Sequence, residues 1–181
     1  MSTKTVKASV PIPENVRLKI MGSVVRVEGA KGSVEKDFSH TPAVFKLEDG
    51  ALTIEVYGRS RRTKALVGTL VSHIKGMFTG VSKGYTYKLK IISSHFPMNV
   101  KVEGGRISIE NFIGERHKRY AKIVGDTKVA VKEDEIILTG PDKESVGQTA
   151  ANIENACRIP RRDPRKFLDG IYIYQKEVAA S

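Results

Sequence analysis

The chain has 181 residues, of which 40% are hydrophobic and 28% are charged, a balance typical of folded domains rather than of a disordered protein. The length suits one large domain or two small ones, and no apolar run approaches the roughly 18–20 residues that a membrane-spanning helix needs. The net charge of +11 and the pI near 9.8 predict a polyanionic partner, without deciding among RNA, DNA and an anionic membrane surface.

The predicted elements begin with an extended arm. The first ten residues mix polar and basic side chains without an apolar block, so we expect no signal peptide and a cytoplasmic protein. Pro11-Ile12-Pro13 is expected to be extended as a lead-in arm, because a proline disfavours helical conformation in the residue before it. Runs with the alternating pattern of half-buried strands come next, at residues 16–20, 25–29, 52–58, 85–91, 100–104, 136–140 and 170–174.

Two stretches have helical spacing instead. Apolar residues recur four apart in the first stretch and form a single stripe in the second. Asp142 is the predicted N-cap of the second helix, and Pro160 marks its end. Gly68 and Gly147 would lie inside the helices, where close approach to the sheet or a local kink would explain them. The stripes are Leu66, Leu70, Ile74 and Phe78, then Val146, Ala150, Ile153 and Cys157.

The same order of elements occurs twice. The sequence Val-Arg-Val-Glu-Gly at residues 25–29 returns as Val-Lys-Val-Glu-Gly at 100–104, each after a strand-like run. A strand ending in glycine and a helix with Val-Gly near its start follow in both halves. We therefore predict tandem homologous domains over residues 1–82 and 83–181. Each is expected to be α+β, a mostly antiparallel sheet with one helix packed on it.

Basic residues gather in three clusters. Residues 59–64 open the first predicted helix, residues 116–122 add an aromatic side chain to four cations, and residues 158–166 carry five positive charges and one negative. Such clusters suit contacts to RNA phosphates and bases. The alternatives are a solvated helix start for the first, a solvated strand edge for the second and a charged connector for the third.

No residue pattern predicts catalysis. The four histidines form no close metal-ligand pair, and there is neither a phosphate-binding loop nor a nucleophile elbow. Glu133-Asp134-Glu135 reads as a solvated turn, His73 as a packing or surface residue, and Cys157 as a small buried thiol. We therefore expect no enzyme, no cofactor and no metal site.

Several local motifs resemble one known family. They are Pro11-Ile12-Pro13, Asn-Phe-Ile-Gly-Glu at residues 111–115, and the segments 140–152 and 165–172. Together they resemble ribosomal large-subunit protein six in its archaeal and eukaryotic branch, along essentially the whole chain. The bacterial branch carries Tyr-Lys-Gly-Lys-Gly near its end, where this chain has residues 165–172 instead, so contacts of bacterial relatives do not transfer to these positions.

This resemblance implies two homologous α+β domains and a structural, non-enzymatic role in the large ribosomal subunit. It implies binding to large-subunit ribosomal RNA near the sarcin–ricin loop, beside other ribosomal proteins and close to the docking region of translational GTPases. The second domain would make the main RNA contact by neutralising phosphates. A basic RNA-binding module acting outside the ribosome is the alternative. The RNA-binding residues implied are Lys143, Arg158, Arg161, Arg162, Arg165 and Lys166, with Arg116 and Lys118 as weaker candidates.

Overall fold

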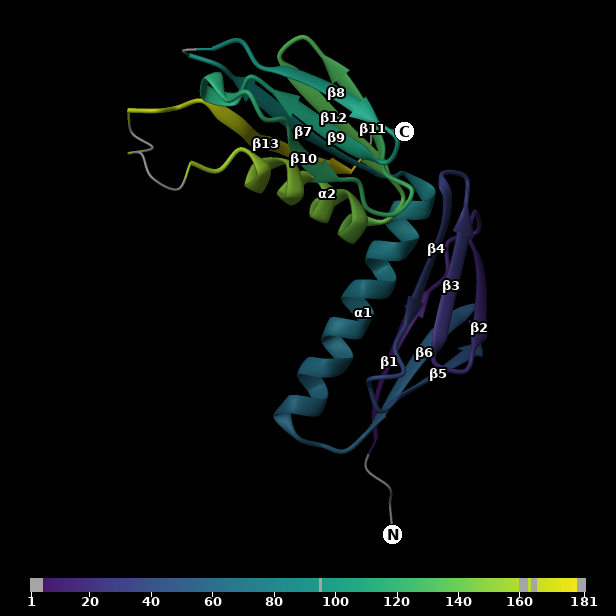
Figure 1. Ribbon diagram of the computed structural model, residues 1–181. Coiled ribbons are helices and arrows are strands. Elements are labelled where there is room, and N and C mark those ends of the chain that lie inside the picture. The colour runs from purple at the N-terminus through teal and green to yellow at the C-terminus, as the bar shows by residue number, and fades with distance from the viewer. Residues whose placement is uncertain (1–4, 95, 160–162, 164–165, 179–181) are drawn as a thin grey trace. The chain divides into compact units, whose positions relative to one another are not determined.

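A computed structural model describes residues 5–94, 96–159, 163 and 166–178 of the chain (Figure 1). These residues form two units, which divide between Lys83 and Gly84 and have separate hydrophobic cores. Each unit contains antiparallel sheets and one α-helix, so the predicted α+β fold with duplicated domains is confirmed.

The first unit has six strands and one helix. The antiparallel sheets β1-β6-β5 and β2-β3-β4 contain three strands each, and α1 packs against β1, β3 and β6. Alternate residues point into the core, so Val25 and Val27 of β3 and Leu52 and Ile54 of β6 are fully buried. The elements are β1 (Thr5–Pro11), β2 (Arg17–Met21), β3 (Val24–Gly29), β4 (Gly32–Asp37), β5 (Ala43–Glu48), β6 (Ala51–Tyr57) and α1 (Arg61–Ser82).

The second unit repeats this plan and adds a strand. Its sheets are the four-stranded β11-β12-β7-β13 and the three-stranded β10-β9-β8, with α2 against β7, β10, β12 and β13. The elements are β7 (Tyr85–Ile92), β8 (Asn99–Glu103), β9 (Arg106–Glu110), the short 3-10 helix η1 (Phe112–Gly114), β10 (Arg119–Lys122), β11 (Lys128–Lys132), β12 (Glu135–Gly140), α2 (Lys143–Ala156) and β13 (Gly170–Val178).

Both helices begin at side-chain caps and bury their predicted stripes. The Ser60 hydroxyl accepts a hydrogen bond from the Thr63 amide, and the Asp142 carboxylate accepts from the Glu144 and Ser145 amides, as predicted for Asp142. All the stripe residues are buried except Leu66, which is half-buried. The second helix ends at Ala156, before the predicted end at Pro160, which lies outside the described residues.

The pairing of strands corrects the predicted alignment of the repeats. In each unit the first strand pairs with the strand preceding the helix, so β1 corresponds to β7 and β6 to β12. Strand β3 then corresponds to β9, whereas the matched sequence 100–104 covers β8. The matched motif was therefore one strand out of register, because alternating apolar and charged residues before a glycine turn suit either strand of a hairpin. The correspondence of the later strands and of the helices holds.

One of the two explanations predicted for the helix glycines, close approach to the sheet, is wrong for Gly68. A Cβ added at Gly68 would meet nothing within 4 Å, so no close approach to the sheet requires glycine there. At Gly147 it would lie 3.7 Å from the Tyr87 ring, which is ordinary van der Waals contact. Gly29 is the position where space is short, since its Cβ would lie 2.7 Å from the Val81 carbonyl oxygen at the end of α1.

Candidate nucleic-acid interface

The loop that carries Arg116 and Lys118 begins in a strained backbone segment. Asn111, Ile113 and Gly114 have φ angles of 58°, 52° and 75°, in the left-handed region. This conformation is unfavourable for a β-branched residue such as Ile113 and persists only where surrounding contacts enforce it. The fully buried Phe112 side chain supplies one such contact, and the Asn111 side-chain amide donates to the Pro97 carbonyl at 3.0 Å.

Arg119 attaches this loop to the end of α2. Its guanidinium makes two hydrogen bonds to the Glu115 carboxylate, at 2.6 and 2.8 Å, and lies 4.4 Å from the centre of the Phe112 ring. The same group donates to the carbonyl oxygens of Ala156 and Arg158 at 2.8 and 3.1 Å. The bond from Arg119 holds the pKa of Glu115 below its ordinary value. Arg119, at the start of β10, therefore bonds the strand that follows Arg116 and Lys118 to the carboxyl end of α2.

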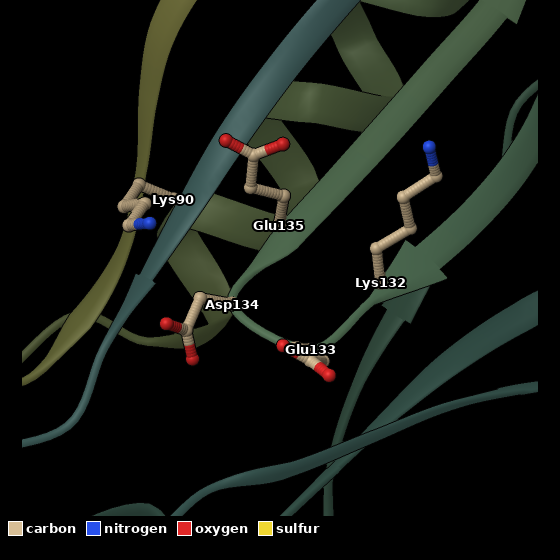
Figure 2. A pocket seen from close by; sticks show the side chains of 5 residues that line it. All are labelled: Lys90, Lys132, Glu133, Asp134 and Glu135. Carbon is tan, nitrogen blue, oxygen red and sulfur yellow. The ribbon is translucent and has the colours of Figure 1, made fainter.

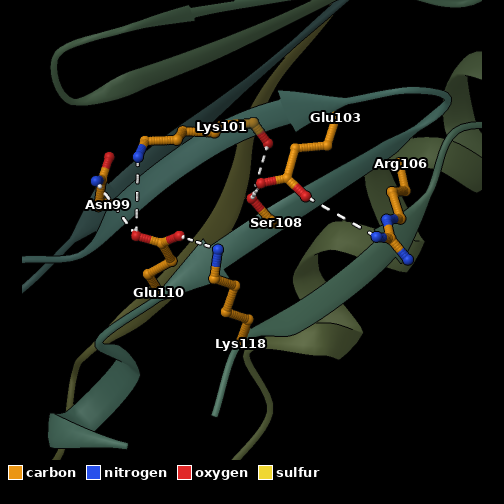
Figure 3. Close-up of polar contacts among 7 residues, drawn as sticks. All are labelled: Asn99, Lys101, Glu103, Arg106, Ser108, Glu110 and Lys118. Carbon is orange, nitrogen blue, oxygen red and sulfur yellow. Dashed lines mark hydrogen bonds and ion pairs between the residues drawn. The ribbon is translucent and has the colours of Figure 1, made fainter. Parts of the chain in front are cut away.

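Some cations of the basic cluster at residues 116–122 already form ion pairs with acidic side chains. Lys118 Nζ lies 2.8 Å from Glu110, which also lies 3.9 Å from Lys101 (Figure 3). This hydrogen bond lowers the pKa of Glu110 and raises that of Lys118. Arg116 is exposed, whereas Lys118 is exposed but paired. The four cations of the cluster thus divide into the structural Arg119, the paired Lys118, and the exposed Arg116 and Lys122.

The predicted aromatic residue of this cluster is also in contact with a cation. Tyr120 is 47% exposed, and the Arg106 guanidinium lies 4.2 Å from the centre of its ring. One face of the ring is therefore in contact with arginine, while the residue remains half exposed to solvent. The sequence did not single out Arg106, because it is fourteen residues before Tyr120 and meets it only through the pairing of β9 with β10.

A cleft of about 430 Å³ opens at the carboxyl end of α2. Arg158, Phe167 and Tyr172 line it together with polar groups of Glu154 and Asn155. Cys157 lies in its wall, and burial raises the pKa of this thiol to about 12, so the sulfur stays protonated. The cleft therefore combines the cation of Arg158, two aromatic rings, and the side chains of Glu154 and Asn155. Proteins hold unstacked bases by stacking them on such rings.

The predicted RNA-binding residues do not all lie together. Arg158 and Lys166 are exposed, Arg158 on the cleft itself and Lys166 next to Phe167 of its lining. Lys143 is exposed at the opposite end of the 14-residue helix α2, about 20 Å away along its axis. Arg161, Arg162 and Arg165 lie outside the described residues.

A second hollow, of about 550 Å³, lies at the turn between β11 and β12 (Figure 2). It is lined by Glu133, Asp134 and Glu135 with Lys90 and Lys132. Glu133 and Asp134 are exposed in the turn, as predicted. The prediction is wrong for Glu135, which begins β12, is half-buried and accepts a hydrogen bond from the Tyr174 hydroxyl at 2.9 Å. This mixture of opposite charges at a turn is typical of a solvated surface.

The duplicated fold and the basic residues of the second unit together define the class of protein. The chain is an internally duplicated, basic α+β protein. Over the part of the chain that the structure describes, no three His, Cys, Asp or Glu side chains are grouped to hold a metal ion. Neither α1 nor α2 is long and apolar enough to cross a membrane, in a search confined to the described residues.

Comparison with known proteins gives the family. A family model described as ribosomal protein L6 matches residues 12–84 and 96–170. Large ribosomal subunit protein uL6 of Aeropyrum pernix is 50% identical over 172 residues, which cover 94% of each chain. The same protein of Staphylothermus marinus is 52% identical over 169 residues, 91% of each chain, and that of Saccharolobus solfataricus is 46% identical over 179 residues, 98% of this chain and 99% of the relative. The chain belongs to the ribosomal protein L6 family.

Membership confirms the predicted resemblance and the internal duplication, since the family model matches twice. The three relatives are archaeal, which agrees with the branch indicated by residues 165–172. Proteins of this family are structural components of the ribosome and not enzymes, as predicted.

Proposed function

We propose that the chain is a structural component of the large ribosomal subunit in the cytoplasm, and that its second domain, residues 83–181, makes the main contact with large-subunit ribosomal RNA. The contact lies near the sarcin–ricin loop, beside other ribosomal proteins, and supports the region where translational GTPases dock. The family match supports the ribosomal role.

The observation that carries the RNA contact is the cleft at the carboxyl end of α2, where a cationic side chain and two aromatic rings lie together. Arg119 joins the Arg116–Lys118 loop to the end of α2 through the Ala156 and Arg158 carbonyls. The cleft that opens there presents Arg158 and the rings of Phe167 and Tyr172. Exposed cations would neutralise phosphates around an RNA loop, and the rings would receive an unstacked base.

The role of each predicted residue follows from its surroundings. Arg158, Lys166 and Arg116 are exposed and bind phosphate directly. Lys118 binds phosphate by exchanging its exposed ion pair with Glu110, because such a pair contributes little in water. Lys143 contacts phosphate at a separate point near the start of α2. Arg161, Arg162 and Arg165 lie outside the described residues, and their contribution to phosphate binding is proposed from the sequence alone.

The dependence of binding on salt tests this proposal. If the second domain neutralises about six phosphates, the log–log slope of affinity against salt is roughly −4 to −5 on deproteinised large-subunit ribosomal RNA. Arg158→Gln with Lys166→Gln makes that slope shallower by about 1.5. The matched control, Arg17→Gln with Lys31→Gln, removes the same charges from exposed positions of the first unit. Equal slopes for the two variants would exclude this cleft as the main contact.

A further inference from the structure

The exposed face of α1 carries only positive formal charge. The 22 residues of the helix include no Asp or Glu. Arg61, Arg62 and Lys64 are exposed in the first turn, and Lys75 is exposed further along. Between the two groups the exposed side chains are small, namely Ala65, Gly68, Thr69 and Ser72.

The cations of the first turn lack the partners that other cations of this unit have. On the sheets, Lys46 lies 3.0 Å from Glu55, and Arg26 lies 3.0 Å from Glu28. Within the described residues no carboxylate lies within ion-pairing distance of Arg61, Arg62 or Lys64, and the first turn has no acidic residue. Cations at this end of a helix also oppose its dipole. A polyanion bound to this face would supply partners for the cations and would offset their repulsion by the helix dipole.

Gly68 leaves room for another molecule to approach the backbone of α1 closely on its exposed face. Glycine inside a helix is unfavourable relative to alanine, and neither space nor a left-handed backbone requires it here. The exposed side chains next to it, Ala65, Thr69 and Ser72, are short as well. A rigid backbone of phosphates and riboses can therefore approach the helix axis closely along this stretch.

We propose that the exposed face of α1 is a second RNA-binding surface, on which a phosphate backbone lies along the helix between Arg61 and Lys75. Charge complementarity favours RNA over a protein partner, because the face has four cations and no carboxylate. It also lacks the aromatic and large apolar side chains that form the centre of protein interfaces. The proposal extends the proposed ribosomal function by giving the first domain its own RNA contact.

The test uses the full chain and deproteinised large-subunit ribosomal RNA. For Arg61→Gln with Lys64→Gln we expect a salt slope shallower by about 1.5 and a Kd about tenfold higher at 0.1 M salt. Arg17→Gln with Lys31→Gln is again the matched control, and it should change the Kd less than about threefold. Equal effects of the two variants would overturn the proposal.

A second variant distinguishes RNA in direct contact with α1 from RNA attracted only by the positive charge of the helix. Gly68→Gln places a neutral side chain on the face where a Cβ meets no other atom. We expect it to keep or raise Tm while weakening RNA binding several-fold with an unchanged salt slope. An unchanged Kd would mean that RNA does not lie on this face.

The variant Arg158→Gln with Lys166→Gln keeps the two proposals distinguishable. If it weakens binding while the α1 variants do not, the inference about α1 is wrong and the proposed function stands. If only the α1 variants weaken binding, the inference holds and the cleft of the second unit is not the main contact. If the α1 variants bind RNA normally but fail to enter large subunits, the occupant of the face is a protein and the inference is wrong.

Discussion

Replacing Arg119 with methionine should loosen the junction on which the proposed RNA contact depends. Methionine keeps the apolar stem beside Phe112 but removes every donor of the guanidinium. The Ala156 and Arg158 carbonyls at the end of α2 then lose their bonds, and Glu115 loses its bidentate partner. The left-handed segment around Ile113 also loses a contact that holds it in place.

The size of the effect follows from these contacts. A hydrogen bond from a charged group contributes about 1.5–3 kcal/mol, and the side chain of Arg119 is 25% exposed, which favours the lower end for its two carbonyl bonds. The ion pair with Glu115, a 40% exposed side chain, adds roughly 0.5 kcal/mol. We therefore expect the second unit to lose about 2–4 kcal/mol of unfolding free energy, a large part of what a small domain possesses.

Amide hydrogen exchange followed by NMR measures the unfolding free energy of the second unit separately, through the protected amides of α2 and β12. Arg106→Met is the matched control, because Arg106 also lies over an aromatic ring but is 55% exposed and bonds no backbone carbonyl among the described residues. Arg106→Met should lower the unfolding free energy of the second unit by less than about 1 kcal/mol. Equal losses for the two variants would refute the structural role of Arg119.

Three further predictions concern caps, glycines and pH. Asp142→Ala should lower the unfolding free energy by about 1 kcal/mol in denaturant titrations, since it removes the acceptor for two helix amides, and no change would contradict the cap. Gly29→Ala should lower Tm through its clash with the Val81 carbonyl, whereas Gly68→Ala should raise it, and the same sign for both would contradict the packing. Cys157, whose folded pKa is raised above its ordinary value of 9.0, stabilises the fold fully below pH 9, and this stability should be lost as pH rises from 9 toward 12. Thiol labelling at pH 8 should accordingly be slow until the protein unfolds.

Periodicity predicted both helices, much of the core and seven of the thirteen strands in the described residues. It missed β4, β5, β9, β10 and β11, and it missed β1, which forms from part of the predicted amino-terminal arm and pairs with β6. The buried stripe of α2 follows from helical spacing, and the capping of Asp142 follows from its place before that stripe. The duplication was also predictable, but its register was not. Strand order depends on pairings between β1 and β6, or between β7 and β12, which are distant in sequence and leave no local pattern.

The candidate site was less predictable, because charge in a sequence does not reveal which cations are paired. Arg119 stands among basic residues yet serves the fold, and Lys118 faces Glu110 across the pairing of β9 with β10. The cleft depends on Phe167 and Tyr172 meeting the end of α2, and this contact comes from the return of the chain into β13. At Gly68 no packing contact of the described residues requires glycine, so the predicted close approach to the sheet was wrong there.

Crosslinking of the native protein to RNA in cells, with sequencing of the crosslinked RNA, tests the central claim most directly. We predict a sharp peak on large-subunit ribosomal RNA around the sarcin–ricin loop, which Arg158→Gln with Lys166→Gln should reduce. Crosslinks spread over many RNAs without a ribosomal peak would contradict the account and favour a basic RNA-binding module that acts outside the ribosome.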